Sequence, residues 1–329
     1  MKAGYRWTLV TDNAEFTPRD GAGALVHADA MWLIGGWNPE DRVTNPNIAG
    51  TNNEVWRSRD GKAWRRVKSN THLDDTFDPA TDWEGRHTAG YVVFGDRMWI
   101  LGGDSNLGHY QPDIWSSGDG RRWTRVLAEA PWGRRILHHT VVHDGKIWVM
   151  GGQRVTRRVR QDVWQWKGEE SETVHNDVWN SADGVNWTRV VEHAPWAPRG
   201  QIGGAAVKDG RIWILGGGTY YATDCADVWS SADGVEWTCH TRKAPWPARQ
   251  YHDVAVFDNR LWVLEGARPE GEGYRNSREV WYSDDGANWT ELPGTPWRER
   301  HAASVFVFRD ALWMVAGNNM ERDVWKLDR

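Results

Sequence analysis

The sequence has few of the features that would place a protein in a membrane or on a nucleic acid. It contains no apolar run of roughly 18 residues, so no transmembrane helix is expected. The first residues, MKAGYRWTLVTDNAEF, include no apolar signal core. The chain as it stands is therefore expected in the cytoplasm, with a secreted mature form as the alternative. A formal net charge of −5 favours neither nucleic acid nor anionic membrane as a partner.

Cysteine is also scarce, since only Cys225 and Cys239 occur and both lie in one repeat. If the segment between them turns near Asp233 and Gly234, the two lie on neighbouring strands but not directly opposite, so a disulfide is possible but not expected. The sequence also lacks a Cys-pair zinc motif, a Gly-rich phosphate loop and a Gly-x-Ser-x-Gly elbow. The local signatures of those three site types are therefore missing.

Tryptophan, by contrast, is abundant, with 26 copies in 329 residues, and it follows a repeat. Residues 177–196 (DVWNSADGVNWTRVVEHAPW) return at 227–246 as DVWSSADGVEWTCHTRKAPW. Looser copies begin at Glu54, Asp113, Glu279 and Asp323. A repeat of about 50 residues built from short strand-like pieces is typical of a β-propeller blade.

Each repeat contains four predicted strands, here called a to d. An arginine precedes strands a and b, which usually end in Gly-Gly; repeats five and six have Glu265-Gly266 and Ala316-Gly317 instead. The DVW…DG…WT half places strands c and d around Asp-Gly, a strong hairpin signal. In such a meander the a–b and c–d turns share one face of the disc, and the b–c and d–a loops share the other.

Columns of tryptophan indicate how the ring closes. Strands b, c and d each carry one tryptophan per repeat, but the chain ends before a sixth strand d. Trp7, in YRWTLV, matches the WTRV of strand d, so the N-terminal strand is expected to complete the last blade and remove its open edge. A further aromatic column precedes strand a: Phe16, Trp83, Trp132, Trp196, Trp246 and Trp297. We interpret these columns as packing between blades.

These repeats resemble the kelch family through Gly-Gly after strand b, tryptophan in strand d and arginine before strand a. The resemblance covers the whole chain. Within the family, the sequence is similar to Trp-rich kelch-like proteins of bacteria. It implies an all-β, six-bladed kelch-type β-propeller of one domain, closed by the N-terminal strand. The expected blades span approximately 17–67, 84–126, 133–190, 197–240, 247–292, and 298–329 with 4–10.

The kelch resemblance is specific for the fold but not for one activity. Kelch-like propellers include protein-interaction modules, a sialic acid mutarotase, a copper radical oxidase and plant specifier proteins that use iron. This sequence shows neither the paired tyrosines and histidines of the copper oxidase nor the Glu-x3-Asp-x3-His of the specifier proteins. It also has no BTB-type domain beside the repeats, and it carries tryptophan where animal kelch adaptors often have tyrosine.

The repeats differ mainly on the b–c and d–a face, where binding sites usually lie. The long loops 37–52, 65–85 and 153–176 are expected there as a possible surface for a partner protein, with the insert 153–176 paired as a β-ribbon. In kelch proteins the residues after the arginine and after Gly-Gly line a pocket at the channel mouth. The residue after each arginine is read as Asp20, His87, Ile136, Gln201, Gln250 or His301. The resemblance implies substrate contacts from Asp20, Trp37, Asp104, Gln153, Arg154, Tyr220, Gln250, Tyr251, Arg268 and Asn318.

Arginine occurs in two patterns with different interpretations. One arginine lies 13 residues before the strand-b tryptophan in five repeats, and Arg199 lies one residue earlier in the fourth. Because every blade carries it, we interpret it as structural. A second group could hold a carboxylate or phosphate, or could be a solvated ribbon neutralised by nearby glutamates. That group comprises Arg154, Arg157, Arg158 and Arg160, with Glu169, Glu170 and Glu172.

Histidines supply the candidate chemistry. His87 and His301 lie near the mouth and are candidate acid–base catalysts, since an unperturbed pKa of about 6.5 suits both roles. His138 and His252 share a deeper position on strand a. Together the four histidines could hold a divalent transition metal, although ligands from different blades leave no spacing signature, and ordinary hydrogen-bonding histidines are the alternative.

Three functions therefore remain open from the sequence. The leading one is a pocket for a small polar ligand, a sugar or sugar acid, with an epimerase, mutarotase or lyase activity as an extension. The alternatives are a non-catalytic protein-interaction scaffold and a metal-dependent enzyme with a histidine site in the central channel.

Overall fold

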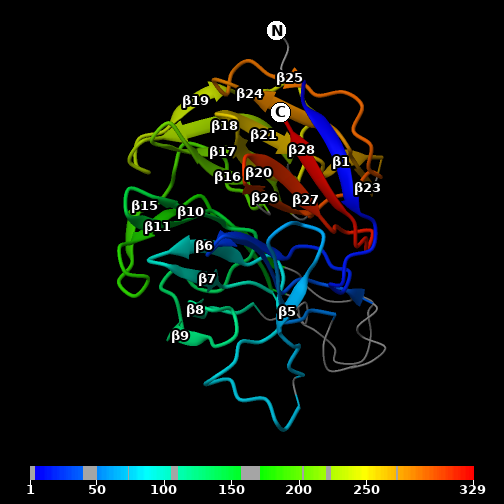
Figure 1. Ribbon diagram of the computed structural model, residues 1–329. Coiled ribbons are helices and arrows are strands. Elements are labelled where there is room, and N and C mark those ends of the chain that lie inside the picture. Colours follow the sequence, from blue (N-terminus) through cyan, green and yellow to red (C-terminus); the bar gives the residue numbers. More distant parts are fainter. Residues whose placement is uncertain are drawn as a thin grey trace.

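The computed structural model describes residues 4–39, 50–72, 74–104, 110–156, 171–201, 204–219, 224–271 and 273–329. Within them the regular structure is β, and Figure 1 shows the sheets arranged around a central axis. Six of these sheets have four antiparallel strands each, which confirms the predicted six-bladed β-propeller. No helix of sufficient length and hydropathy to cross a bilayer occurs in the described part of the chain.

Each blade runs from an inner strand a to an outer strand d. Blade 1 is β2 (Gly23–His27), β3 (Ala30–Ile34), β4 (Val55–Ser58) and β5 (Arg65–Lys68); blade 2 is β6 (Gly90–Phe94), β7 (Arg97–Leu101), β8 (Ile114–Ser117) and β9 (Thr124–Leu127). Blade 3 is β10 (His139–His143), β11 (Lys146–Met150), β14 (Val178–Ser181) and β15 (Thr188–Val191); blade 4 is β16 (Ala205–Lys208), β17 (Arg211–Gly218), β18 (Asp224–Ser231) and β19 (Thr238–Thr241). Blade 5 is β20 (Asp253–Phe257), β21 (Arg260–Leu264), β24 (Val280–Ser283) and β25 (Thr290–Glu291); blade 6 is β26 (Ser304–Phe308), β27 (Ala311–Val315), β28 (Val324–Asp328) and β1 (Arg6–Thr11).

The six a strands form the wall of a central channel, because each contacts the a strand of both neighbouring blades. Backbone hydrogen bonds join the blades just before these strands. Thr88 N donates to Gly21 O, and Leu137 N donates to Thr88 O, each at 3.1 Å. Thr88 and Leu137 both have a φ of 55°, in the left-handed region that costs a non-glycine residue energy. The repeated geometry is therefore imposed by contacts between blades.

The N-terminal strand closes the ring as the sequence predicts. Strand β1 pairs antiparallel with β28, and Trp7 lies opposite Leu327. The Trp7 ring meets Trp297 edge to face, with the ring centroids 4.2 Å apart. Figure 1 shows β1 and β28 side by side. The two ends of the chain thus share one blade.

The hydrophobic core is divided into six clusters, one at each boundary between neighbouring blades. Each cluster contains one aromatic ring from each of the four columns. Between blades 3 and 4 these rings are Trp148, Trp196, Trp229 and Trp237. The ring before strand a meets the strand-d tryptophan edge to face at every boundary, in the favoured geometry for aromatic pairs. The packing interpretation of the tryptophan columns is confirmed.

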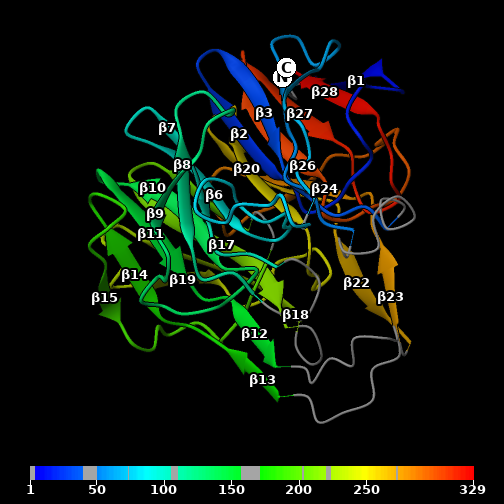
Figure 2. The same cartoon turned by 90° about the horizontal axis from the view of Figure 1, so that it is seen from below.

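Two-stranded ribbons extend two of the b–c connections. The first, β12 (Gln153–Thr156) with β13 (Ser171–Val174), confirms the predicted pairing of the insert in its described residues. The second, β22 (Ala267–Glu270) with β23 (Gly273–Asn276), was not predicted. Both project on the side of the ring away from the chain ends (Figure 2).

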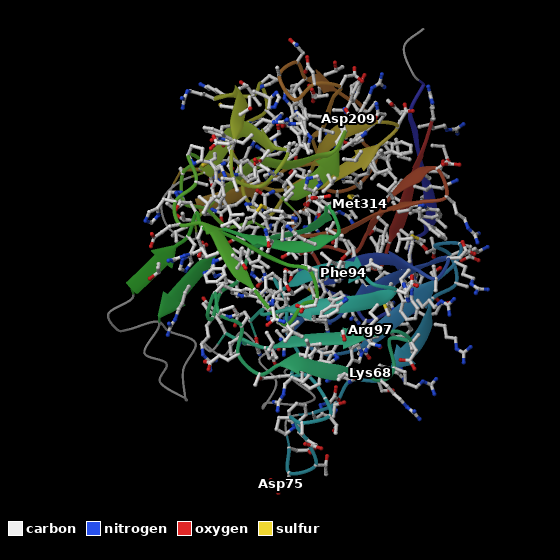
Figure 3. All side chains as sticks on the ribbon, turned by 90° about the vertical axis from the view of Figure 1, so that its left-hand side faces the viewer. Lys68, Asp75, Phe94, Arg97, Asp209 and Met314 are labelled. Atoms are coloured by element: carbon white, nitrogen blue, oxygen red, sulfur yellow. The ribbon has the colours of Figure 1, made fainter. Side chains whose placement is uncertain are left out.

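The d–a connection that leads into blade 2 is also long. Its base is tied down, because Lys68 Nζ lies 3.0 Å from Asp82 Oδ2 and the Thr71 hydroxyl donates to the same oxygen at 2.7 Å. Asp75 lies at its far tip, well away from the ring (Figure 3). The two cysteines lie on β18 and β19 and are both free, as expected from their positions.

Trp7→Ala should lower the free energy of unfolding by about 3–5 kcal/mol, because it removes an aromatic partner from the boundary between blades 5 and 6, where residues of both chain ends pack together. Leu9→Ala is the matched control, since Leu9 lies on the same strand but is 44% exposed. It should cost less than about 1 kcal/mol. Urea unfolding followed by tryptophan fluorescence compares them, and equal losses would contradict the role assigned to β1.

Candidate functional site

The arginine before each strand a forms the buried frame beneath the loop-rich face. In blade 3, Arg135 Nη1 donates to Asp177 Oδ1 at 2.6 Å and to Gly151 O at 2.9 Å. Burial raises the pKa of Asp177, but the bonds from Arg135 outweigh burial and hold that pKa below its usual range. The six pairs are Arg19–Glu54, Arg86–Asp113, Arg135–Asp177, Arg199–Asp227, Arg249–Glu279 and Arg300–Asp323. The structural interpretation of this arginine column is confirmed.

The acidic residue that opens each DVW motif is thereby explained. It accepts from the arginine and also from the strand-c indole, as where Trp179 Nε1 donates to Asp177 Oδ2 at 2.7 Å. Neighbouring blades are linked through the same residues. Gly36 N, for example, donates to Arg86 O of the next blade at 2.9 Å. Gly36 has a φ of 108°, which only glycine adopts easily, so the second glycine of the pair is needed here.

The two predicted groups of mouth residues meet in pairs. Asp20 and Trp37 exchange backbone hydrogen bonds of 2.9 Å, and His87 and Asp104 do the same at 2.9 and 3.1 Å. Corresponding pairs are Ile136 with Gln153, Gln250 with Ala267, and His301 with Asn318. In blade 4 the pair is Gly200 with Gly218.

The reading of Gln201 as the residue after the arginine is therefore wrong. Gly200 occupies that position, and Gln201 N instead donates to Leu137 O of the preceding blade at 2.6 Å. The fourth repeat has one more residue between its arginine and its strand-b tryptophan, and the extra residue falls after Gln201. A match based on the spacing to the tryptophan therefore points to Gln201 instead of Gly200.

Among the described residues, the paired positions form polar groups on two sides of the channel mouth. On the side of blades 1 and 2, the Trp37 and His87 rings lie 6.5 Å apart. Burial raises the pKa of Asp20 to about 8. On the opposite side, Gln250 Nε2 donates to Asp224 Oδ1 at 2.9 Å and to the Tyr274 hydroxyl at 2.7 Å. The described members of the predicted set thus include one polar group at blades 1 and 2 and another at blades 4 and 5.

An apolar cluster lies between these polar groups. Tyr110 from blade 2 packs with Ile136 and Leu137 of blade 3, and Tyr251 of blade 5 packs against them. Because blades 3 and 5 are not neighbours in the ring, this contact reaches across the channel mouth. Tyr251 also lies beside His301, with the ring centroids 5.2 Å apart. We call these residues the mouth cluster.

A polar groove of about 390 Å³ lies beside the mouth cluster, between the β22–β23 ribbon and the loops of blade 6. It contains the predicted residues His301 and Asn318. Its lining is Tyr274, Asn276, Arg298, Glu299, His301, Asn318 and Asn319, and we call it the blade 5–6 groove.

Hydrogen bonds hold this lining in place. His301 Nδ1 lies 2.7 Å from Asn276 Oδ1, and Asn276 Nδ2 donates to Asn318 Oδ1 at 3.1 Å. Because Asn276 Oδ1 can only accept, His301 Nδ1 carries the proton and Nε2 is left as an acceptor. Tyr274 is 49% exposed, and its hydroxyl accepts from Gln250 Nε2.

The other predicted contacts lie outside the groove. Arg268 is bound at 3.4 Å to Glu279, which also holds Arg249. Arg154 is exposed on β12, and Gln153 beside it is buried. Tyr220 and the arginines at 157, 158 and 160 lie outside the described residues. Neither Arg154 nor Arg268 is placed as an anion anchor for the groove.

The two candidate catalytic histidines are both neutral at pH 7. Burial lowers the pKa of His87 to about 4, and burial lowers that of His301 to about 4 as well. His87 Nδ1 contacts its own blade, 3.2 Å from Asp104 O, whereas His301 belongs to the groove. A general acid must hold a proton near the working pH, and neither imidazole does.

His138 and His252 fill spaces between blades. A Cβ at Gly102 would lie 3.3 Å from His138 Cε1, and one at Gly216 would lie 3.0 Å from His252 Cε1. His252 Nε2 is 2.9 Å from Leu215 O of the preceding blade. Across the described ranges, no three His, Cys, Asp or Glu side chains group as metal ligands, so they lend the predicted four-histidine metal site no support.

Sequence reasoning missed the part of the groove that comes from blade 5 and from the loop before blade 6. Tyr274 and Asn276 lie on β23, and Arg298 and Glu299 lie in the d–a connection. The available signal was the length of the b–c connection after Gly266, with Gly271 and Gly273 near its centre, which fits a hairpin.

Comparison with known proteins finds only distant sequence similarity. No family model matches the chain. Alpha-scruin of Limulus polyphemus is 25% identical over 254 residues, which is 71% of this chain and 24% of that protein. Beta-scruin of the same organism is 25% identical over 211 residues, 61% of this chain and 19% of that protein. The chain thus spans less than a quarter of these relatives, and the similarity to kelch-repeat proteins fits the six-bladed ring.

Arg199→Met should lower the free energy of unfolding by about 3–5 kcal/mol, because it leaves Asp227 without its buried cation. Arg199→Met combined with Asp227→Leu should cost less than the sum of the single changes. Arg189→Met is the control, since the Arg189 side chain is 46% exposed. Denaturant unfolding of the four proteins makes the comparison, and additive losses would show that the pair is not coupled.

Proposed function

We propose that the protein is a binding module whose blade 5–6 groove holds a small polar ligand, a sugar or sugar acid. The observation that carries the proposal is the groove itself, about 390 Å³ in volume and lined by one tyrosine, three asparagines, a histidine, an arginine and a glutamate. Ligand pockets for small molecules begin at about 300 Å³. The ring and kelch-type similarity are compatible with either ligand or partner binding.

The side chains of the groove match the surface of a saccharide. An exposed aromatic face such as that of Tyr274 packs against the C–H side of a pyranose ring. Asparagine amides both donate and accept, as sugar hydroxyls do, and His301 Nε2 adds an acceptor. Arg298, exposed at the rim, would select a carboxylate over a hydroxymethyl group.

Catalysis is not part of the leading proposal. Epimerases and lyases need a proton donor and acceptor on the same substrate. In the groove, His301 is neutral, and its Nδ1 is committed to Asn276. His87 contacts the backbone of its own blade and is not in the groove lining.

Calorimetric titration with a hexuronic acid and its parent hexose tests the groove. Tyr274→Ala and Asn318→Ala should each weaken binding at least about tenfold, and Arg298→Gln should weaken only the acid. Affinity should not change between pH 6 and 8, because His301 stays neutral throughout. His193→Ala, an exposed histidine at the outer end of blade 3, is the control. Saccharide binding that survives Tyr274→Ala, or no binding across a saccharide panel, would refute the assignment.

A second candidate is a protein-interaction scaffold, and the two ribbons favour it. Strands β12–β13 and β22–β23 project on the same side of the ring (Figure 2), and in the described part of the chain each ribbon is a sheet of two strands. Exposed edges can accept an added strand from a partner. The similarity to scruins is compatible with such a role.

Replacing residues 155–174 by a short Gly-Ser linker tests the scaffold. If a partner protein binds this ribbon, the replacement should abolish its capture in a quantitative pull-down, while no small ligand raises the melting temperature. Val235→Ser is the control, because Val235 is 42% exposed on the opposite face. Unchanged capture after the replacement would exclude this ribbon as the contact.

A further inference from the structure

The central channel contains a polar cavity of about 190 Å³, separate from the blade 5–6 groove. Residues from all six blades line it. Small residues such as Ala24 and Gly90 leave the space open, and the polar side chains come from four blades. These are Thr88 and Tyr91 of blade 2, His138, His139 and Thr140 of blade 3, Asp253 of blade 5 and Ser304 of blade 6.

Several of these polar side chains lack hydrogen-bond partners. Both ring nitrogens of His139, the hydroxyls of Thr88, Tyr91 and Thr140, and Oδ2 of Asp253 are buried without one. His139 is 1% exposed and Asp253 is 6% exposed. Buried polar groups in native proteins are normally satisfied by protein, water or ligand. The cavity therefore provides donors and acceptors for a molecule placed inside it.

A second buried carboxyl lies behind Asp253. Glu265 occupies the position of the first glycine in Gly-Gly, with a φ of 50° where the glycines at 35, 102, 151 and 216 have 60–63°. Its side chain is fully buried against the Asp253 carboxyl, so the two acids can share one proton. A glutamate at a left-handed, buried position is costly, so a plain structural role explains it poorly.

The two carboxyls have no cation of their own. The guanidinium groups that interact with Glu265 are those of Arg249 and Arg300, and both are already paired with other carboxylates. Arg249 binds Glu279, and Arg300 binds Asp323 at 2.7 Å. His252, next to Asp253 in the chain, is kept neutral because burial lowers its pKa to about 3.

A retained proton takes the place of that cation. Burial raises the pKa of Asp253 to about 7, and burial together with the neighbouring Asp253 raises that of Glu265 well above its usual range. Both folded-state pKa values lie above those of the unfolded chain. Stability from this pair is thus greatest in acid and falls as the pH rises from about 4 towards 7.

We propose that the central cavity binds a small primary amine, whose ammonium group is held by Asp253 and hydrogen-bonded by His139 and Thr140, with Glu265 as a second carboxyl behind Asp253. The cavity suits about six to eight non-hydrogen atoms, since a cavity of roughly 150 Å³ takes benzene. The amine enters already protonated, and the proton held by the carboxyl pair leaves to solvent. One cation is taken up and one proton is released.

Access is available from the a–b face. Val26 and Val307 lie two residues along β2 and β26 from Ala24 and Val305, which line the cavity, so they face the same side of their strands. They are 38% and 40% exposed. The channel is thus open to solvent at the end opposite the mouth cluster.

Butylamine and 1-butanol, which share a shape, distinguish charge recognition from simple filling. Butylamine should raise the melting temperature more than butanol or an equal concentration of potassium chloride, and more at pH 8 than at pH 5.5. Calorimetry in two buffers of different ionisation enthalpy should report proton release at pH 8. Equal shifts from amine and alcohol, or no shift from either, would mean that the cavity holds only water.

Glu265→Gly is the decisive variant, because it restores the residue used by four other blades and is expected to fold. In this variant, and in Asp253→Asn, the butylamine concentration needed for the same rise in melting temperature should increase at least about tenfold. Asp209→Gly is the matched control: Asp209 has a φ of 50° too, but lies on a surface turn (Figure 3). An undiminished amine response in Glu265→Gly would overturn the proposal. The amine response does not depend on saccharide binding in the blade 5–6 groove, so failure of that binding would not contradict it.

Discussion

The architecture depends on one buried arginine in each blade. Its guanidinium ties the start of strand a to the acidic residue before strand c and to the carbonyl after strand b, as Arg135 does with Asp177 and Gly151. At several boundaries its own carbonyl accepts from the glycine of the preceding blade, as Arg199 O does from Gly152 N. A single residue therefore organises its own sheet and links it to the next. The cost of burying the charge is offset by several bonds of good geometry.

This frame separates the rigid part of the protein from the variable part. The residues common to every blade form the arginine pairs, the left-handed turns and the tryptophan packing. The loops above the frame are then free to differ, and they carry the ribbons, the mouth cluster and the groove. The face formed by the a–b and c–d turns repeats the same Ser–Asp–Gly hydrogen bonds in blade after blade, as in Ser181 with Asp183 and Gly184. Differences between copies therefore identify functional positions better than the copies themselves.

Two departures from the repeat carry different meanings. His138 and His252 are large residues placed over glycines of the preceding blade, so they fit their surroundings by size. Glu265 reverses this arrangement, because the large residue takes the glycine position and a small one, Ala303, follows in the next blade. The two histidines therefore serve as packing elements. Glu265 brings charge chemistry into the channel wall, which packing alone does not require.

The sequence by itself determined the blade number, the four strands, the closure through Trp7 and the structural arginine. All of them follow from comparing the copies of one repeated pattern. Local patterns of period two and Asp-Gly turns are enough to specify such elements. The groove was decided only by the tertiary structure. Tyr274, Arg298 and Asn318 lie on three separate connections, and contacts between loops of different blades leave no periodic trace. The mouth cluster, where Leu137 meets Tyr251 across the channel, and the Asp253–Glu265 pair likewise depend on ring closure, which brings together residues that no local spacing relates.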